Sequence, residues 1–197
     1  MGVLKALLLP LQLWNDTVLK VGRWIAVGAI ALMVIAILIQ VFYRYVLNNA
    51  LPWPDEAARF AMLWMTGRIA PTALRRGGFV AIDRVVEALP ERLGAILSLF
   101  LLLLSALVLG FGVMIGWGEV TGFGGTFNTA ALYVPTSLDF SEWYRVPRWW
   151  MFLSLFVGVV LMFIVNLELI LRALITILGG AEDLKPIPPG EDEIMAE

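Results

Sequence analysis

The sequence predicts an all-α integral membrane protein with four membrane-spanning helices, plus an amphipathic helix on the cytoplasmic face between the second and third spans. Two observations support this fold class. The 197 residues are 60% hydrophobic and 15% charged, with a mean hydropathy of +0.87, whereas a soluble domain carries about 25% charged residues. The chain also contains long apolar runs, and a helix needs roughly 20 apolar residues to cross the hydrocarbon core.

The predicted spans are residues 24–47, about 55–74, 93–117 and about 148–169. The first and third are unbroken apolar runs, and their length favours helices over strands. The second is the least hydrophobic of the four. The helical pattern of the fourth continues to about Leu178.

We expect residues 1–180 to form a single transmembrane domain. Residues 181–197 are acidic and contain several prolines, which predicts a disordered cytoplasmic tail. Before the first span, Pro10 and Trp14 follow an apolar stretch without a small-residue cleavage site. This stretch therefore favours a short interfacial segment over a cleaved signal.

Basic residues predict the orientation, because Lys and Arg concentrate in cytoplasmic flanks. With the N-terminus inside, nine of them lie in inner flanks: Lys5, Lys20, Arg23, Arg75, Arg76, Arg84, Arg92, Arg172 and Lys185. Four lie in outer flanks: Arg44, Arg59, Arg145 and Arg148. This asymmetry predicts that both termini are cytoplasmic.

The three connections differ in character. The short loop around residues 48–54 makes the first two spans antiparallel neighbours. Residues 79–92 approximate an amphipathic helix, which fits a lipid surface and a linker helix packed on the bundle equally well. Residues 118–147 form the longest loop and are rich in Gly, Thr and aromatics. We expect this periplasmic loop to be functional.

Charged side chains cluster where the second span begins. Asp55 and Arg59 are one helical turn apart and can pair, which leaves Arg44 of the first span as the partner for Glu56. The cluster either only fixes the helical hairpin or has a further role. Arg68 lies farther inside the span, where an Arg costs roughly 3 kcal/mol. It either snorkels to the cytoplasm or faces a protein partner.

The residues offer little for catalysis or transport within this chain. The chain has no Cys and no His, so it lacks the commonest general base and the commonest haem ligand. We expect no enzyme activity, no cofactor and no bound metal. Glu168 and Arg172 have i, i+4 spacing and most simply form a surface pair. Small residues spaced along the third and fourth spans predict helix packing, either within the bundle or against another membrane protein.

The stretch from Tyr43 to Pro90 resembles the small membrane subunit (Q subunit, DctQ-like) of tripartite ATP-independent periplasmic (TRAP) transporters. The matching residues, in order, are Arg44-Tyr45, Trp53, Asp55-Glu56, Arg59, Trp64, Gly67, Gly77-Gly78, Ile82-Asp83 and Pro90. The chain length and the four predicted spans also match. The resemblance therefore covers most of the chain.

The resemblance implies an accessory subunit in the bacterial inner membrane. Such a subunit scaffolds a large multi-span subunit that imports an organic-acid-type solute with sodium, and it helps to dock a periplasmic binding protein. Its other contacts would be membrane lipids, and no nucleic acid is expected. The alternative from the residues alone is a stand-alone four-span scaffold or assembly factor.

The candidate residues fall into three groups. Those of a structural charge latch are Arg44, Asp55, Glu56 and Arg59. Those of a subunit interface are Trp53, Trp64, Gly67, Arg68, Ser105, Gly112 and Gly116. Those that would dock the binding protein are Asp139, Glu142, Trp143, Tyr144 and Arg145.

Overall fold

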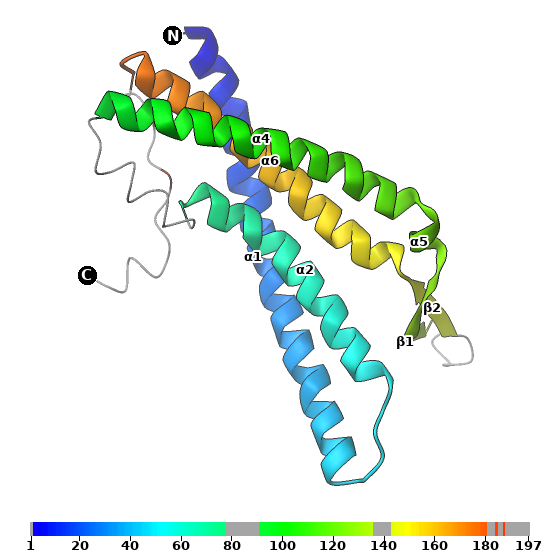
Figure 1. The fold of residues 1–197 in the computed structure, drawn as a ribbon. Coiled ribbons are helices and arrows are strands. Elements are labelled where there is room, and N and C mark those ends of the chain that lie inside the picture. Colours follow the sequence, from blue (N-terminus) through cyan, green and yellow to red (C-terminus); the bar gives the residue numbers. More distant parts are fainter. Residues whose placement is uncertain (1, 78–90, 136–142, 181–183, 185–186, 188–197) are drawn as a thin grey trace, which may run out of the picture. The chain divides into compact units, whose positions relative to one another are not determined.

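The computed structural model describes residues 2–77, 91–135, 143–180, 184 and 187. In chain order the elements are α1 (Gly2–Tyr45), α2 (Trp53–Arg75), α4 (Glu91–Thr121), α5 (Phe123–Thr126), β1 (Asn128–Pro135), β2 (Trp143–Pro147) and α6 (Trp149–Ile177) (Figure 1). Helices dominate, as predicted. Most of the predicted amphipathic helix at 79–92, and most of the predicted tail, lie outside the described residues.

Helix α1 is continuous over 44 residues and includes Pro10. The segment expected at the membrane interface is therefore continuous with the helix of the first predicted span, and its interfacial location stays a prediction. A proline removes one hydrogen bond of the helix. Leu8 and Leu19 on either side of it are buried, so packing within their unit offsets that loss and keeps the stretch helical.

Among the described residues, three helical segments are long and apolar enough to cross a membrane: Ala6–Tyr45, Leu93–Thr121 and Trp149–Ile177. Helix α2 has 23 residues, which is a sufficient length, but it is not among the three. Its charged residues lower its hydropathy, above all Asp55, Glu56 and Arg59 near its start. A fourth membrane crossing therefore stays a prediction.

The chain divides into two compact units, each built from separate segments. The first unit comprises Met1–Lys20, Ala70–Phe111 and Val160–Glu197, and the second comprises Val21–Ile69 and Gly112–Val159. Buried apolar residues of the first unit are mainly large: Leu8, Leu19, Leu161, Val165 and Ile175. The buried helical residues of the second unit are small, among them Ala26, Ala36, Ala57, Ala61 and Ser154. Small residues allow helix backbones to approach closely.

The long third connection contains a two-stranded antiparallel sheet of β1 and β2. Tyr133 pairs with Arg145, and Asn128 pairs with Pro147. Five steps along β1 thus match only two along β2, so β1 bulges between these pairs. The predicted all-α class is wrong for this segment. Its β-branched and aromatic residues favour strands, but the strands are too short for a clear alternation in the sequence.

Candidate functional site

A cluster of charged and amide side chains is buried in the first unit. Glu168 on α6 is fully buried, and its Oε1 accepts hydrogen bonds from Arg75 Nη2 at 2.9 Å and from Arg172 Nε at 3.1 Å. Its Oε2 accepts a third from Asn15 Nδ2 at 2.6 Å. Arg75 also donates to the carboxylate of Asp16. These five residues, here called the Glu168 network, join α1, α2 and α6 through one carboxylate.

The Glu168 network is electrically balanced, since two Arg side chains face two carboxylates. Glu168 and Arg75 are 0% and 6% exposed, Arg172 is 12% exposed and Asp16 is half-exposed. An unpaired charge at such depth costs several kcal/mol, and hydrogen-bonded pairing offsets this cost. Arg75 is also the last residue of α2, where the helix dipole favours a cation. The network therefore suits a structural clamp between helices.

The Glu168 network partly confirms and partly corrects the sequence prediction. Glu168 and Arg172 do form the ion pair that their spacing predicts. The prediction that this pair lies on the surface is wrong, because both side chains are covered within the first unit. The partners Asn15, Asp16 and Arg75 were not predicted. The polar Asn15-Asp16-Thr17 step within an apolar helix was the available signal.

In the second unit, Glu56 of α2 binds the bulge of β1. Its Oε1 accepts the backbone N–H of Ala130 at 2.8 Å, and its Oε2 accepts that of Ala131. From β2, Arg145 donates to the carbonyl oxygens of Thr129 and Ala130. Hydrogen bonds to charged groups are stronger than neutral ones. Glu56 and Arg145 thus hold the bulge through its N–H and C=O groups, and Glu56 ties the hairpin to α2.

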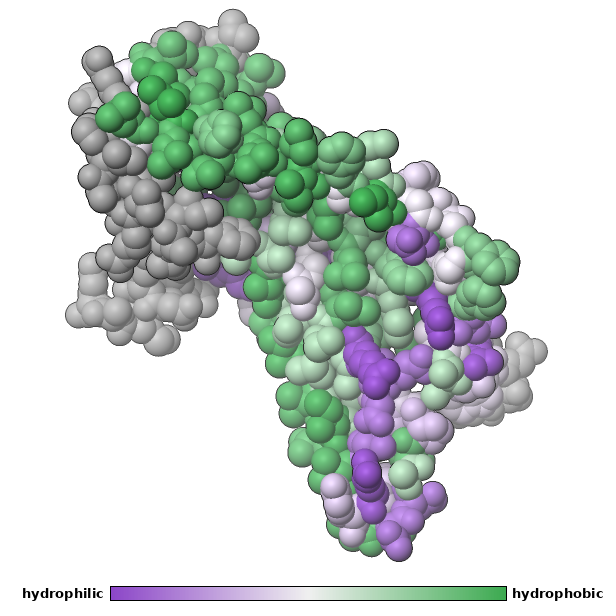
Figure 2. Space-filling view, viewed as in Figure 1, coloured by the Kyte–Doolittle hydropathy of each residue, from purple (hydrophilic) through white to green (hydrophobic). Residues whose placement is uncertain are grey.

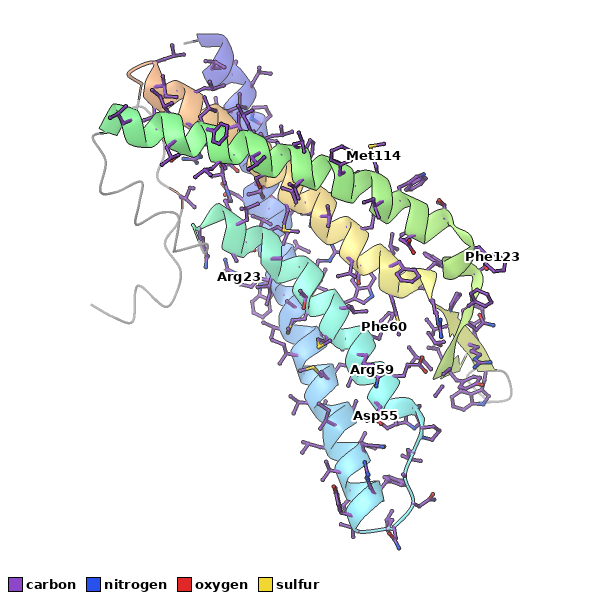
Figure 3. All side chains as sticks on the ribbon, viewed as in Figure 1. Arg23, Asp55, Arg59, Phe60, Met114 and Phe123 are labelled. Atoms are coloured by element: carbon purple, nitrogen blue, oxygen red, sulfur yellow. The ribbon has the colours of Figure 1, made fainter. Side chains whose placement is uncertain are left out.

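The two ion pairs predicted for the charge latch are absent from the described residues. Glu56 binds the β1 backbone instead of Arg44, because two adjacent N–H groups satisfy both of its oxygens. Arg44 lies over the ring of Tyr45, 5.8 Å from its centroid. Asp55 and Arg59 are exposed on α2 and do not pair with each other (Figure 3).

The predicted interface glycines pack within the chain. A Cβ on Gly67 of α2 would lie 2.4 Å from the carbonyl oxygen of Ser154, and one on Gly158 would lie 2.7 Å from Gly67 Cα. On α4, a Cβ on Gly112 or Gly116 would come within 3.0 Å of a side chain of α6. The structure therefore uses these glycines for close helix contacts in the second unit. Partner contacts of the remaining interface candidates, Trp53, Trp64, Arg68 and Ser105, stay a prediction.

Arg68 packs against Trp64 of its own helix. Its guanidinium lies 5.1 Å from the centroid of the Trp64 ring, which is within the range of a cation–π contact. Arg68 is half-buried and its Nε has no hydrogen-bond partner in the described residues. Its backbone oxygen and Cβ also lie within 4 Å of the position of a Cβ on Gly22 of α1. The absence of a side chain at Gly22 gives Arg68 room beside α1.

The candidate docking residues separate into two groups. Asp139 and Glu142 lie outside the described residues. Trp143, Tyr144 and Arg145 lie on β2, and all three are exposed. Arg145 has a structural task as well, because it binds β1 and lies over the ring of Tyr133 at 5.6 Å. The hairpin therefore presents aromatic side chains on a framework that Glu56 and Arg145 hold.

Comparison with known proteins gives one finding. Residues 33–176 match the family described as "Tripartite ATP-independent periplasmic transporters, DctQ component". The match covers 144 of the 197 residues, counted as 176 − 33 + 1. The chain belongs to this family. Curated proteins and solved structures give no match.

Membership in the DctQ family confirms the resemblance predicted from the sequence. It identifies the chain as the small membrane component of a TRAP transporter, a membrane protein that works with other components. The matched region contains the Glu56 anchor and three members of the Glu168 network: Arg75, Glu168 and Arg172. Asn15 and Asp16 precede it. The described residues contain no group of three or more acidic side chains that could hold a metal ion.

Proposed function

We propose that this protein is the accessory subunit of a sodium-coupled TRAP transporter that imports an organic-acid-type solute with the help of a periplasmic binding protein. In this proposal the chain scaffolds the large membrane subunit and contributes docking surface for the binding protein. The DctQ family match over residues 33–176 carries the proposal. Sodium coupling and the solute class rest on the family resemblance.

The use of the charged side chains supports a scaffolding role. Glu168, Arg75 and Arg172 neutralise one another in a buried network, and Glu56 is occupied by the β1 backbone. These groups hold the chain's own elements together. Isolation with a co-expressed large multi-span subunit tests the scaffold. Stable co-purification is expected, and complete separation in mild detergent would contradict it.

The proposal places both termini in the cytoplasm and the β1–β2 hairpin in the periplasm. The excess of Lys and Arg in the flanks that would then be cytoplasmic supports this orientation. A periplasmic reporter enzyme fused at residue 185 is expected to be inactive. The same enzyme inserted in the hairpin between β1 and β2 is expected to be active, and the reverse pattern would overturn the orientation.

The proposed docking surface for the binding protein is formed by the exposed aromatic residues of the hairpin. Tyr133, Trp143 and Tyr144 are each about half-exposed, and aromatic residues are enriched in protein interfaces. Tyr144→Ala is expected to lower uptake when the binding protein is limiting and to leave it unchanged at saturation. Equal uptake by Tyr144→Ala and wild type at every concentration of binding protein would contradict this docking role.

A further inference from the structure

Helix α2 exposes a single row of residues in the second unit. Between Pro54 and Ile69 the exposed residues are Asp55, Arg59, Met62, Thr66 and Ile69. Their spacing alternates between four and three residues, which is the spacing of a seam that packs against another helix. These five residues are here called the α2 row. Figure 2 shows hydrophilic residues gathered at the start of α2.

The α2 row contains two charges that the described chain does not satisfy. Asp55 and Arg59 have no ion pair or hydrogen bond to any described residue, although they are one turn apart. Glu56 beside them is fully engaged with β1. The hydroxyl of Thr66 donates to the carbonyl oxygen of Met62 at 2.9 Å and is satisfied by its own helix. Asp55 and Arg59 are therefore the charges of the row that are available to a partner outside the chain.

The α2 row differs from the face that α1 exposes between Trp24 and Phe42. On α1, every exposed residue between Trp24 and Phe42 is apolar or glycine, which suits the lipid chains. Charged groups are costly in hydrocarbon, and in membranes they face protein or water. A row with an anion and a cation one turn apart, continued by Met62 and Ile69, suits contact with another protein helix.

We infer that the α2 row binds one transmembrane helix of the large membrane subunit, which places a basic side chain opposite Asp55 and an acidic one opposite Arg59. This inference rests on the proposed function, since it names the surface that receives the large subunit. Charge complementarity sets the register and orientation of such a contact. Met62 then lies at the centre of the seam, where a flexible apolar side chain fits an irregular partner surface.

Photocrosslinking in the intact complex tests this inference. A benzophenone amino acid replaces Met62 in the row or, as a matched control, Met114 on α4, which is exposed as well (Figure 3). Position 62 is expected to give at least about tenfold more crosslinked large subunit than position 114, because the proposed contact lies on α2 and not on α4. No crosslink from position 62 in a complex that still co-purifies would overturn it and would show that the row faces lipid.

Charge reversal gives an independent test. Asp55→Arg is expected to lower the yield of co-purified large subunit by at least about tenfold, because it places like charges together at an interface. Glu119→Arg on α4 serves as the control and is expected to leave the yield unchanged. Unchanged yield for Asp55→Arg would overturn the inference while the proposed function stands. If the wild-type chain co-purifies no large subunit, the proposed function itself fails.

Discussion

Replacing Glu168 by Gln tests the role of the Glu168 network. The substitution keeps the size of the side chain and removes its charge. Two cations then face one anion, so the cluster carries a net charge of +1. Glu168 accepts from three donors, at 2.9, 3.1 and 2.6 Å. A Gln side chain offers one oxygen and turns its amide N–H groups toward at least one of these donors.

The expected loss follows from burial. Removing one partner of a buried ion pair costs about 3–5 kcal/mol, and Arg172 lowers the cost by turning its partly exposed guanidinium toward solvent. We therefore expect the low end, about 3 kcal/mol of unfolding free energy. For a chain of this size that corresponds to a fall in melting temperature of roughly 6–12 °C.

Thermal unfolding in detergent, followed by the fluorescence of the eight Trp residues, measures this change. Glu119→Gln, the same substitution at an exposed position of α4, is the control and should shift the melting temperature by less than about 2 °C. Adding Arg172→Met to Glu168→Gln restores charge balance and should recover part of the loss. If Glu168→Gln and Glu119→Gln shift the melting temperature by the same amount, the network does not stabilise the fold.

Two further substitutions test the second unit. Glu56→Gln should speed hydrogen exchange of the two β1 amides about tenfold or more, because the lost charge-assisted bonds are worth about 1.5–3 kcal/mol; Asp55→Asn is the control, and equal exchange in both variants would contradict the anchor. Gly67→Ala should lower the melting temperature by several degrees, because its Cβ would lie 2.4 Å from a backbone oxygen. Gly28 of α1 is the control, because a Cβ there meets nothing within 4 Å, and Gly28→Ala should be neutral or stabilising. Equal changes in melting temperature for Gly67→Ala and Gly28→Ala would contradict the close contact at Gly67.

Much of the helical framework was predictable from the sequence. Long apolar runs leave few alternatives to helices, and α4 and α6 cover the predicted spans at 93–117 and 148–169. The helix also continues past the fourth span, to Ile177. The continuity of α1 through Pro10 was not predicted, because it depends on packing that the sequence does not display.

The contacts of individual charges were less predictable. The spacing of Glu168 and Arg172 shows that they can pair. A local pattern cannot show that Glu168 also binds Arg75, which lies 93 residues earlier in the sequence. Glu56 was assigned to Arg44 because side-chain charges are visible in a sequence and backbone N–H groups are not. The anchor needs a bulge in β1, 74 residues beyond Glu56. Such partners appear only when the chain is folded.

Solute uptake into proteoliposomes tests the central claim most directly. The large membrane subunit is reconstituted with and without this protein, in the presence of its binding protein and a sodium gradient. The account predicts uptake only when both membrane subunits are present and none with this protein alone. Full uptake by the large subunit without this protein, or uptake by this protein alone, would contradict its role as an accessory subunit.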